Sequence, residues 1–138
     1  MSEVTQIEAY RASQVVLRDR RAKIERLLMN KDFKEMILHG FCRDDAARYI
    51  QEAGDPLLDD RQRADAMAIA MSSGHLKRYL AITMQMGATA VSSIAEADEA
   101  LVEARAEEDQ AQVQALSQEQ SVAAATDRPS DAAGWDVT

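Results

Sequence analysis

The stretch that decides the fold is residues 59–105, which read DDRQRADAMAIAMSSGHLKRYLAITMQMGATAVSSIAEADEALVEAR. It is long and contains no proline, so its backbone can continue as one helix. Its apolar residues recur three, four or seven positions apart, as they do on one face of an α-helix. We therefore expect a long helix over 59–105 with one buried stripe. That stripe consists of Ile69, Leu76, Leu80, Met84, Gly87, Val91, Ile94 and Leu101.

The first half of this helix carries a second apolar face, roughly opposite the stripe, that ends near residue 87. A helix with two apolar faces contacts neighbours on two sides, whereas an ordinary core helix with an exposed end would contact them on one. We expect the second face to meet either the short helices that precede it or another molecule. Beyond residue 87 we expect the stripe to meet a helix. The second face consists of Met67, Met71, Tyr79, Ile82 and Met86.

Two glycines lie within the expected helix. A glycine inside a helix costs about 1 kcal/mol relative to alanine, so its presence needs a reason. Gly87 lies on the apolar stripe, where a missing side chain lets another backbone approach closely. Gly74 follows two serines, and it predicts a kink or break in a helix that otherwise continues.

The N-terminal segment is expected to form a helix over residues 4–29 that packs with the long helix. It contains neither proline nor glycine, and its apolar residues recur with helical spacing, although two polar residues, Gln14 and Arg21, interrupt the stripe. The stripe consists of Tyr10, Leu17, Ile24, Leu27 and Leu28.

Residues 33–53 are expected to form two short helices. Asp32 and Glu35 resemble a capping box at the start of the first helix, and Gly40 is suited to end it. Asp44 would cap the second helix, and Gly54 would end it. Their apolar residues predict a small core against the first half of the long helix. These residues are Phe33, Ile37, Leu38, Phe41, Tyr49, Ile50, Leu57 and Leu58.

Beyond Arg105 the sequence consists mainly of Ala, Glu, Gln and Ser, with few large apolar residues. We expect the helix to fray toward Glu119 and residues 106–138 to form a flexible, acidic, low-complexity tail, disordered from residue 121. Trp135 is the single tryptophan of the chain. It predicts an anchor that docks the tail into a partner protein, although a lone aromatic residue in such a tail also occurs without a role.

Charge is distributed unevenly along the 138 residues, whose formal net charge is -8. Residues 1–43 carry nine Lys and Arg against six Asp and Glu, residues 44–87 five against seven, and residues 88–138 two against eleven. This asymmetry suits head-to-tail or antiparallel contacts between copies, docking on a basic partner, or simply a solvated acidic tail. Because aromatic residues make up only 4% of the chain, we expect an elongated all-α hairpin or bundle that oligomerises with itself.

The cellular setting follows from three features. Cys42 is the only cysteine, which excludes an intrachain disulfide and favours a reducing compartment. The first residues, MSEVTQIEAY, lack the basic and apolar regions of a signal peptide. No apolar run approaches the roughly 18 residues of a membrane span. We expect a soluble protein made in the cytoplasm, with no membrane partner.

Motifs for catalysis, metal binding and cofactor binding are absent from the sequence. His39 and Cys42 lie three residues apart, and His75 is the only other histidine, whereas zinc sites repeat paired His or Cys ligands. The five glycines are scattered and form no phosphate-binding loop. No serine or cysteine lies in a recognisable nucleophile motif. We expect a protein that is not an enzyme and needs neither metal nor cofactor.

A basic first helix leaves nucleic-acid binding open as an alternative function. Its cations would contact phosphates, but the acidic residues of segment 44–87 would repel the same phosphates. The candidate contacts are Arg18, Arg20, Arg21, Lys23 and Arg26.

Several short motifs between residues 28 and 105 resemble small helical proteins encoded by tailed bacteriophages. They are Asp32-Phe33-Lys34, Ile37-Leu38-His39-Gly40-Phe41, Asp45-Ala46-Ala47-Arg48, Gly54-Asp55-Pro56 and Gly74-His75-Leu76-Lys77-Arg78-Tyr79-Leu80. The resemblance implies a multi-copy virion structural component, or alternatively an assembly chaperone or scaffold that is absent from the finished particle. In either case the protein is made in the host cytoplasm. The predicted protein interface consists of Met67, Met71, Tyr79, Ile82, Met86, Gly87, Val91, Ile94, Leu101 and Trp135.

Overall fold

The computed structural model describes residues 2–126, and these residues contain helices but no strand. In chain order the elements are α1 (Glu3–Met29), α2 (Lys31–Phe33), the π-helix η1 (Lys34–Asp45), α3 (Ala46–Ala53) and α4 (Asp60–Thr126). The predicted all-α fold, with a long helix packed against an N-terminal helix, is confirmed.

Side-chain caps fix the starts of the two main helices. Ser2 caps α1, because its Oγ accepts a hydrogen bond from the Thr5 backbone N–H at 3.1 Å. Asp59 and Gln62 form a reciprocal capping box at the start of α4. The Asp59 carboxylate accepts from the Gln62 N–H at 2.7 Å, and the Gln62 side-chain oxygen accepts from the Asp59 N–H at 3.1 Å. The long helix therefore begins where the sequence predicted.

The segment between the main helices is one continuous helical run from Lys31 to Ala53, so two expectations about it are wrong. The cap at its start is Asn30, whose side-chain oxygen accepts from the Phe33 N–H at 2.9 Å, and not Asp32. Gly40 does not end a helix, because it lies within η1 and no described glycine has a positive φ. The run ends at Gly54, as predicted.

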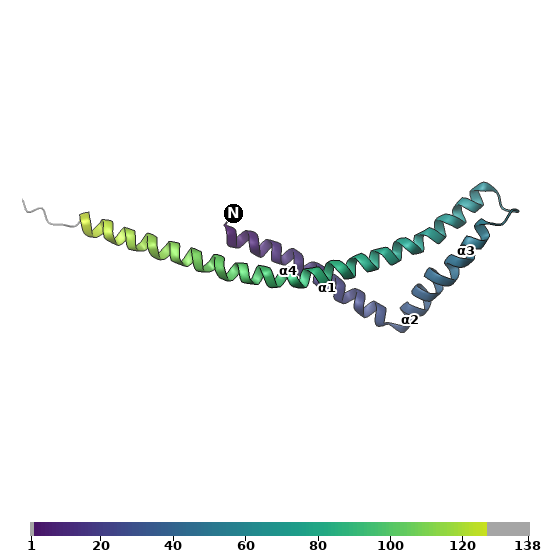
Figure 1. The fold of residues 1–138 in the computed structure, drawn as a ribbon, viewed down its shortest axis with the longest axis horizontal. Helices are drawn as coiled ribbons and strands as arrows, with labels where there is room; N and C mark the ends of the chain where they lie inside the picture. The colour runs from purple at the N-terminus through teal and green to yellow at the C-terminus, as the bar shows by residue number, and fades with distance from the viewer. Residues whose placement is uncertain (1, 127–138) are drawn as a thin grey trace, which may run out of the picture.

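Helix α4 contains 67 residues and continues to Thr126, well beyond Arg105. The helix was expected to fray toward Glu119, so the prediction of disorder is wrong for residues 121–126. Alanine, glutamate and glutamine have high helix propensity, and they carry the backbone onward without a buried face. The helix runs without a break through Gly74 and curves along its length (Figure 1). Trp135 lies outside the described residues.

The elements form an elongated antiparallel hairpin (Figure 1). Helix α1 lies along the middle of α4 in the opposite direction, since Glu8 contacts Arg105 whereas Arg20 contacts Tyr79. The continuous run through η1 and α3 returns along the first part of α4 to the turn at residues 54–59. The C-terminal end of α4 extends beyond the start of α1 (Figure 1).

A heptad pattern defines the contact between α1 and α4, which we call the seam. From residue 73 to 104, the α4 residues that point toward the packed helices alternate spacings of three and four, as in coiled coils. Half of them are glycine, alanine or serine, so the two backbones can approach closely. The seam residues of α4 are Ser73, Leu76, Leu80, Thr83, Gly87, Ala90, Ile94, Ala97, Leu101 and Ala104.

The core is thin, because no large described side chain is less than 2% exposed. The small core predicted for the short helices is present only in part. Six of its eight residues are half-buried, whereas Ile50 and Leu57 are 55% and 91% exposed. Cys42 is the only described residue that is buried between residues 30 and 59. The accessible surface of the chain is 10357 Å². A compact monomer of 15.2 kDa would expose roughly 7,100 Å². The fold therefore leaves about 3,000 Å² more surface than a globular chain of this mass.

Candidate protein interface

The two helices approach each other closely at Gly87. A Cβ atom built on Gly87 would clash with the Cβ of Arg21 and would lie 2.9 Å from its Cδ. The predicted close approach at Gly87 is therefore present, and it is made with α1 of the same chain. The Arg21 guanidinium donates to the Met84 carbonyl at 3.4 Å and to Glu25 at 2.9 Å, so a polar side chain occupies this part of the seam.

Ion pairs connect the two helices along one edge of the seam. Arg11 pairs with Asp98 at 2.6 Å, and Arg105 pairs with Glu8 at 3.0 Å. Asp98 and Arg105 each follow a seam residue of α4 directly, which places both on the same side of that helix. The basic N-terminal helix and the acidic second half of α4 therefore meet within one chain, in antiparallel orientation.

Replacing Asp98 with asparagine should lower the free energy of unfolding by less than about 1 kcal/mol. Both partners of this ion pair are partly exposed, and water screens such pairs. Urea unfolding followed by circular dichroism measures the change. A loss above about 2 kcal/mol would mean that the pair is shielded from water and matters far more than its exposure indicates.

The predicted interface residues fall into two groups. Ile94 and Leu101 are buried in the seam together with Gly87, so they hold the hairpin itself together. The second apolar face is exposed, and its five side chains, Met67, Met71, Tyr79, Ile82 and Met86, are each 40–58% accessible. The expectation that Ile69 and Val91 are buried on the stripe is wrong, since they are 40% and 55% exposed.

Tyr79 connects the exposed face to α1. The Arg20 guanidinium donates to the Tyr79 hydroxyl at 2.9 Å. This hydrogen bond and the positive charge of Arg20 lower the pKa of the Tyr79 phenol, because both favour its ionised form. The contact connects the middle of the exposed face to α1.

Three hollows lie between α1 and α4. One of about 370 Å³ lies among the ion pairs and is lined by Glu8, Arg11, Ala12, Asp98, Leu101 and Arg105. The other two are shallow hollows with volumes of about 300 Å³ and 270 Å³. Both helices line both hollows. The first is lined by Gln6, Ile7, Tyr10, Glu96, Ala97 and Ala100, and the second by Gln14, Leu17, Gln85, Met86 and Thr89. Sequence reasoning missed this surface, because each helix contributes only part of it and the α4 part consists mainly of alanine.

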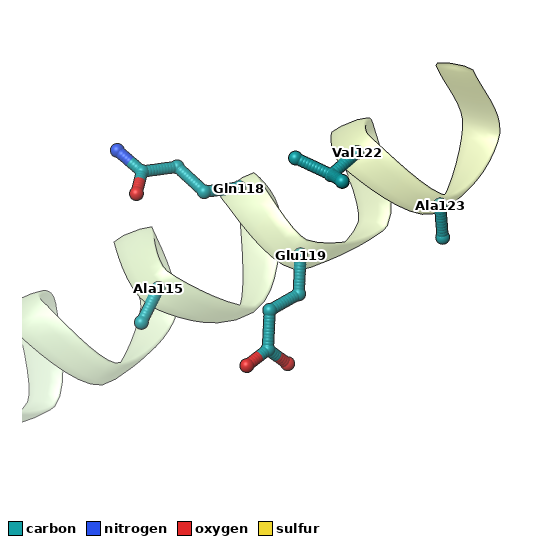
Figure 2. Close-up of a pocket in the computed structure, with 5 residues that line it drawn as sticks. All are labelled: Ala115, Gln118, Glu119, Val122 and Ala123. Carbon is teal, nitrogen blue, oxygen red and sulfur yellow. The ribbon is translucent and has the colours of Figure 1, made fainter. Parts of the chain in front are cut away.

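Other features offer little chemistry. The Cys42 thiol is buried and donates to the Ser73 carbonyl at 3.9 Å, which ties η1 to α4. Among residues 2–126, no three His, Cys, Asp or Glu side chains come together where they would hold a metal ion. A further hollow lies on the C-terminal part of α4, and Figure 2 shows that its five lining residues come from this one helix and do not converge on a point.

The cations of α1 are largely engaged with protein groups, which disfavours the nucleic-acid alternative. Arg18 contacts Asp19, Arg20 contacts Tyr79, and Arg21 contacts Glu25. A phosphate backbone would have to displace these partners in a chain whose net charge is -8.

None of the described helices combines the length and the apolar character needed to cross a membrane. Comparison with known proteins found no matching family model, no matching curated protein and no matching solved structure.

Proposed function

We propose that this chain is a non-enzymatic helical protein that works in many copies by contacting other proteins, as a structural or assembly component of a bacteriophage virion. The observation that carries the interaction role is the second apolar face of α4. Five large side chains lie there on one helix, and the rest of the described chain leaves each of them 40–58% exposed. An exposed apolar face of this kind marks a site for protein contact.

Two further features support the proposal. The thin core and the large accessible surface favour a chain that completes its burial by association. The bacteriophage assignment depends on the sequence motifs between residues 28 and 105 that resemble small phage-encoded helical proteins. A virion component and an assembly scaffold differ only in whether the protein remains in the finished particle.

Light scattering of the purified chain at micromolar concentration tests the interaction role, and we expect a mass above 15.2 kDa. Replacing Met71 and Ile82 with glutamine removes apolar area from the exposed face without touching the seam. We expect this variant to raise the dissociation constant at least about tenfold. A matched glutamine at Val102, which is 69% exposed, should leave the constant unchanged.

Mass spectrometry of purified phage particles and of assembly intermediates tests the virion role. Presence in the finished particle identifies a structural component, whereas presence only in intermediates identifies a scaffold. If the chain is absent from both, the virion assignment is wrong. If it is a compact monomer that captures no virion protein, the interaction role is wrong as well.

A further inference from the structure

Helix α1 and the helical run from Lys31 to Ala53 are separated by a single residue. Between Glu3 and Ala53, Asn30 alone has a backbone outside the helical region, with a φ of -74° and a ψ of 124°. This φ is already that of a helix, and the Asn30 carbonyl already accepts from the Lys34 N–H at 3.1 Å. Residues 3–39 contain neither proline nor glycine. A rotation of ψ at Asn30 would therefore join α1 and the run into one straight helix.

The bend at Asn30 lies outside the packed parts of the hairpin. Every residue from 25 to 32 is exposed except Leu28, which is half-buried. Figure 1 shows that the bend points away from α4. Two hydrogen bonds hold the bend: the Asn30 N–H donates to the Leu27 carbonyl at 3.0 Å, and the Asn30 side chain accepts from the Phe33 N–H at 2.9 Å. The bend is therefore fixed by its own caps rather than by packing against α4.

Helix α1 is held on α4 by a small buried area. Ile24 is the only residue of α1 that is buried, and the polar residues Gln14 and Arg21 interrupt its apolar stripe. The two interhelical ion pairs add little stability, because their side chains are 37–57% exposed. Separating the two helices therefore exposes little of α1, whereas it uncovers the seam of α4.

The structure shows which segment fits the uncovered seam. Helix α1 matches it in shape, because the stem of Arg21 fills the space that Gly87 leaves. It also matches it in charge, because both interhelical ion pairs form in the antiparallel orientation. A second copy of the chain carries an identical α1, which would make the same contacts in the same seam. No further complementary surface is needed.

The balance between the closed hairpin and an exchanged form depends on the bend and on concentration. The contacts of α1 with α4 are the same in both forms. The closed form keeps the two caps at Asn30, whereas the exchanged form makes this residue helical. Many copies in one place raise the concentration of α1 around each seam, which favours the exchanged form.

We infer that α1 is exchanged between two copies of this chain: Asn30 becomes helical, and α1 of each copy packs in the seam of the other. This inference rests on the proposed function, which brings many copies together, and it adds a contact distinct from the second apolar face. Because each copy gives and receives the same helix, the contact is isologous and closes as a dimer.

Two substitutions at the bend act on the exchange in opposite directions. Lys31→Pro is compatible with the closed hairpin, because proline suits the first position of a helix and favours an extended residue before it, as Asn30 is. The same proline would interrupt the straight helix of the exchanged form. Asn30→Ala removes the side-chain cap and raises helix propensity, so it favours the straight helix. Lys31→Ala is the matched control.

Light scattering of the full chain at tens of micromolar compares these variants. We expect Lys31→Pro to raise the dissociation constant of the dimer at least about a hundredfold, and Asn30→Ala to lower it about tenfold. The control Lys31→Ala should match wild type. Circular dichroism should show the same helix content in Lys31→Pro as in wild type, which excludes unfolding as the cause of its weaker association.

Charge reversal at the interhelical ion pairs tests the exchange directly. One chain carries Glu8→Arg with Arg11→Asp, and the other carries Asp98→Arg with Arg105→Glu. Each chain alone brings like charges together, whether its α1 is closed or exchanged. In a mixture, only the exchanged heterodimer pairs opposite charges.

We expect the dissociation constant of this heterodimer to be at least about tenfold below that of either chain alone. A single chain with all four changes restores the ion pairs with their signs reversed. It should associate as wild type does.

Two results would overturn the inference and leave the proposed function standing. In the first, Lys31→Pro associates as tightly as wild type. In the second, the mixture associates no more tightly than its separate chains, although wild type associates. A wild-type chain that is monomeric at tens of micromolar and captures a virion protein has the same effect. Conversely, weaker association of Lys31→Pro, with no change on replacing Met71 and Ile82 with glutamine, would support the exchange and contradict the role proposed for the second apolar face.

Discussion

Replacing Gly87 with alanine should lower the free energy of unfolding by up to about 2 kcal/mol, although alanine is the better helix former. The propensity gain is about 1 kcal/mol. Against it, the new methyl group would overlap the Cβ of Arg21, which cannot swing aside because it is attached directly to the α1 backbone. The helices must move apart, and overpacking of this kind typically costs about 1–3 kcal/mol. Urea unfolding followed by circular dichroism measures the difference.

The matched control is Gly74→Ala in the same helix. A Cβ at Gly74 meets no atom within 4 Å, so only the propensity gain remains. We expect this variant to be more stable than wild type by about 0.5–1 kcal/mol. If both alanine variants are more stable than wild type, α1 and α4 do not approach each other closely at Gly87.

Truncating Leu101 to alanine should destabilise the hairpin by about 2–3 kcal/mol. Leu101 is 5% exposed and is one of three large α4 residues buried in the seam, with Leu80 and Ile94. Removing its methyl groups loses buried apolar area and leaves a cavity that two rigid helices fill poorly. Because the core is thin, few other apolar contacts compensate for the buried area that Leu101 loses.

The neighbouring Val102→Ala change provides the comparison. Val102 is 69% exposed, so its truncation should alter stability by no more than about 0.5 kcal/mol. Thermal unfolding of both variants under the same conditions measures the difference in stability between them. Equal effects at 101 and 102 would mean that α1 does not pack on the side of α4 where the seam lies.

The sequence predicted the parts of the fold that depend on large apolar residues and on special backbone positions. Leu80, Ile94 and Leu101 are buried, and Gly87 is a close-approach point, as expected. Hydrophobic spacing is a strong signal for a long amphipathic helix. The starting point of α4 was also readable, because aspartate and glutamine at capping positions satisfy free backbone N–H groups.

The small residues of the seam were not predicted. Ala90 is fully buried and Ala97 is 4% exposed, whereas Ile69 and Val91 lie outside the seam. A search for large apolar side chains overlooks alanine, whose role depends on how closely the partner helix approaches. The seam repeats every seven residues, a period of 3.5 residues per turn. A stripe predicted with a period of 3.6 residues therefore moves away from the seam along the helix.

The end of α4 was misjudged for a related reason. Beyond Arg105 the residues bury no face. The prediction extended the helix only as far as the apolar spacing indicated a buried face. The helix continues through a segment of alanine, glutamine and glutamate, residues of high helix propensity. The role of the exposed face stays a prediction, because a sequence shows that a face is apolar without showing what covers it.

The seven-residue repeat of the seam also limits how the protein can change in length. The 67 residues of α4 span about 100 Å, so the length of this helix sets the distance between the turn at residues 54–59 and its C-terminal end at Thr126. Inserting seven residues within the seam would shift the C-terminal end of α4 by about 10 Å and keep the seam residues on the side that faces the packed helices. Inserting one or two residues there would rotate the seam residues beyond the insertion away from that side. Within the seam, the length of α4 is therefore adjustable in whole heptads.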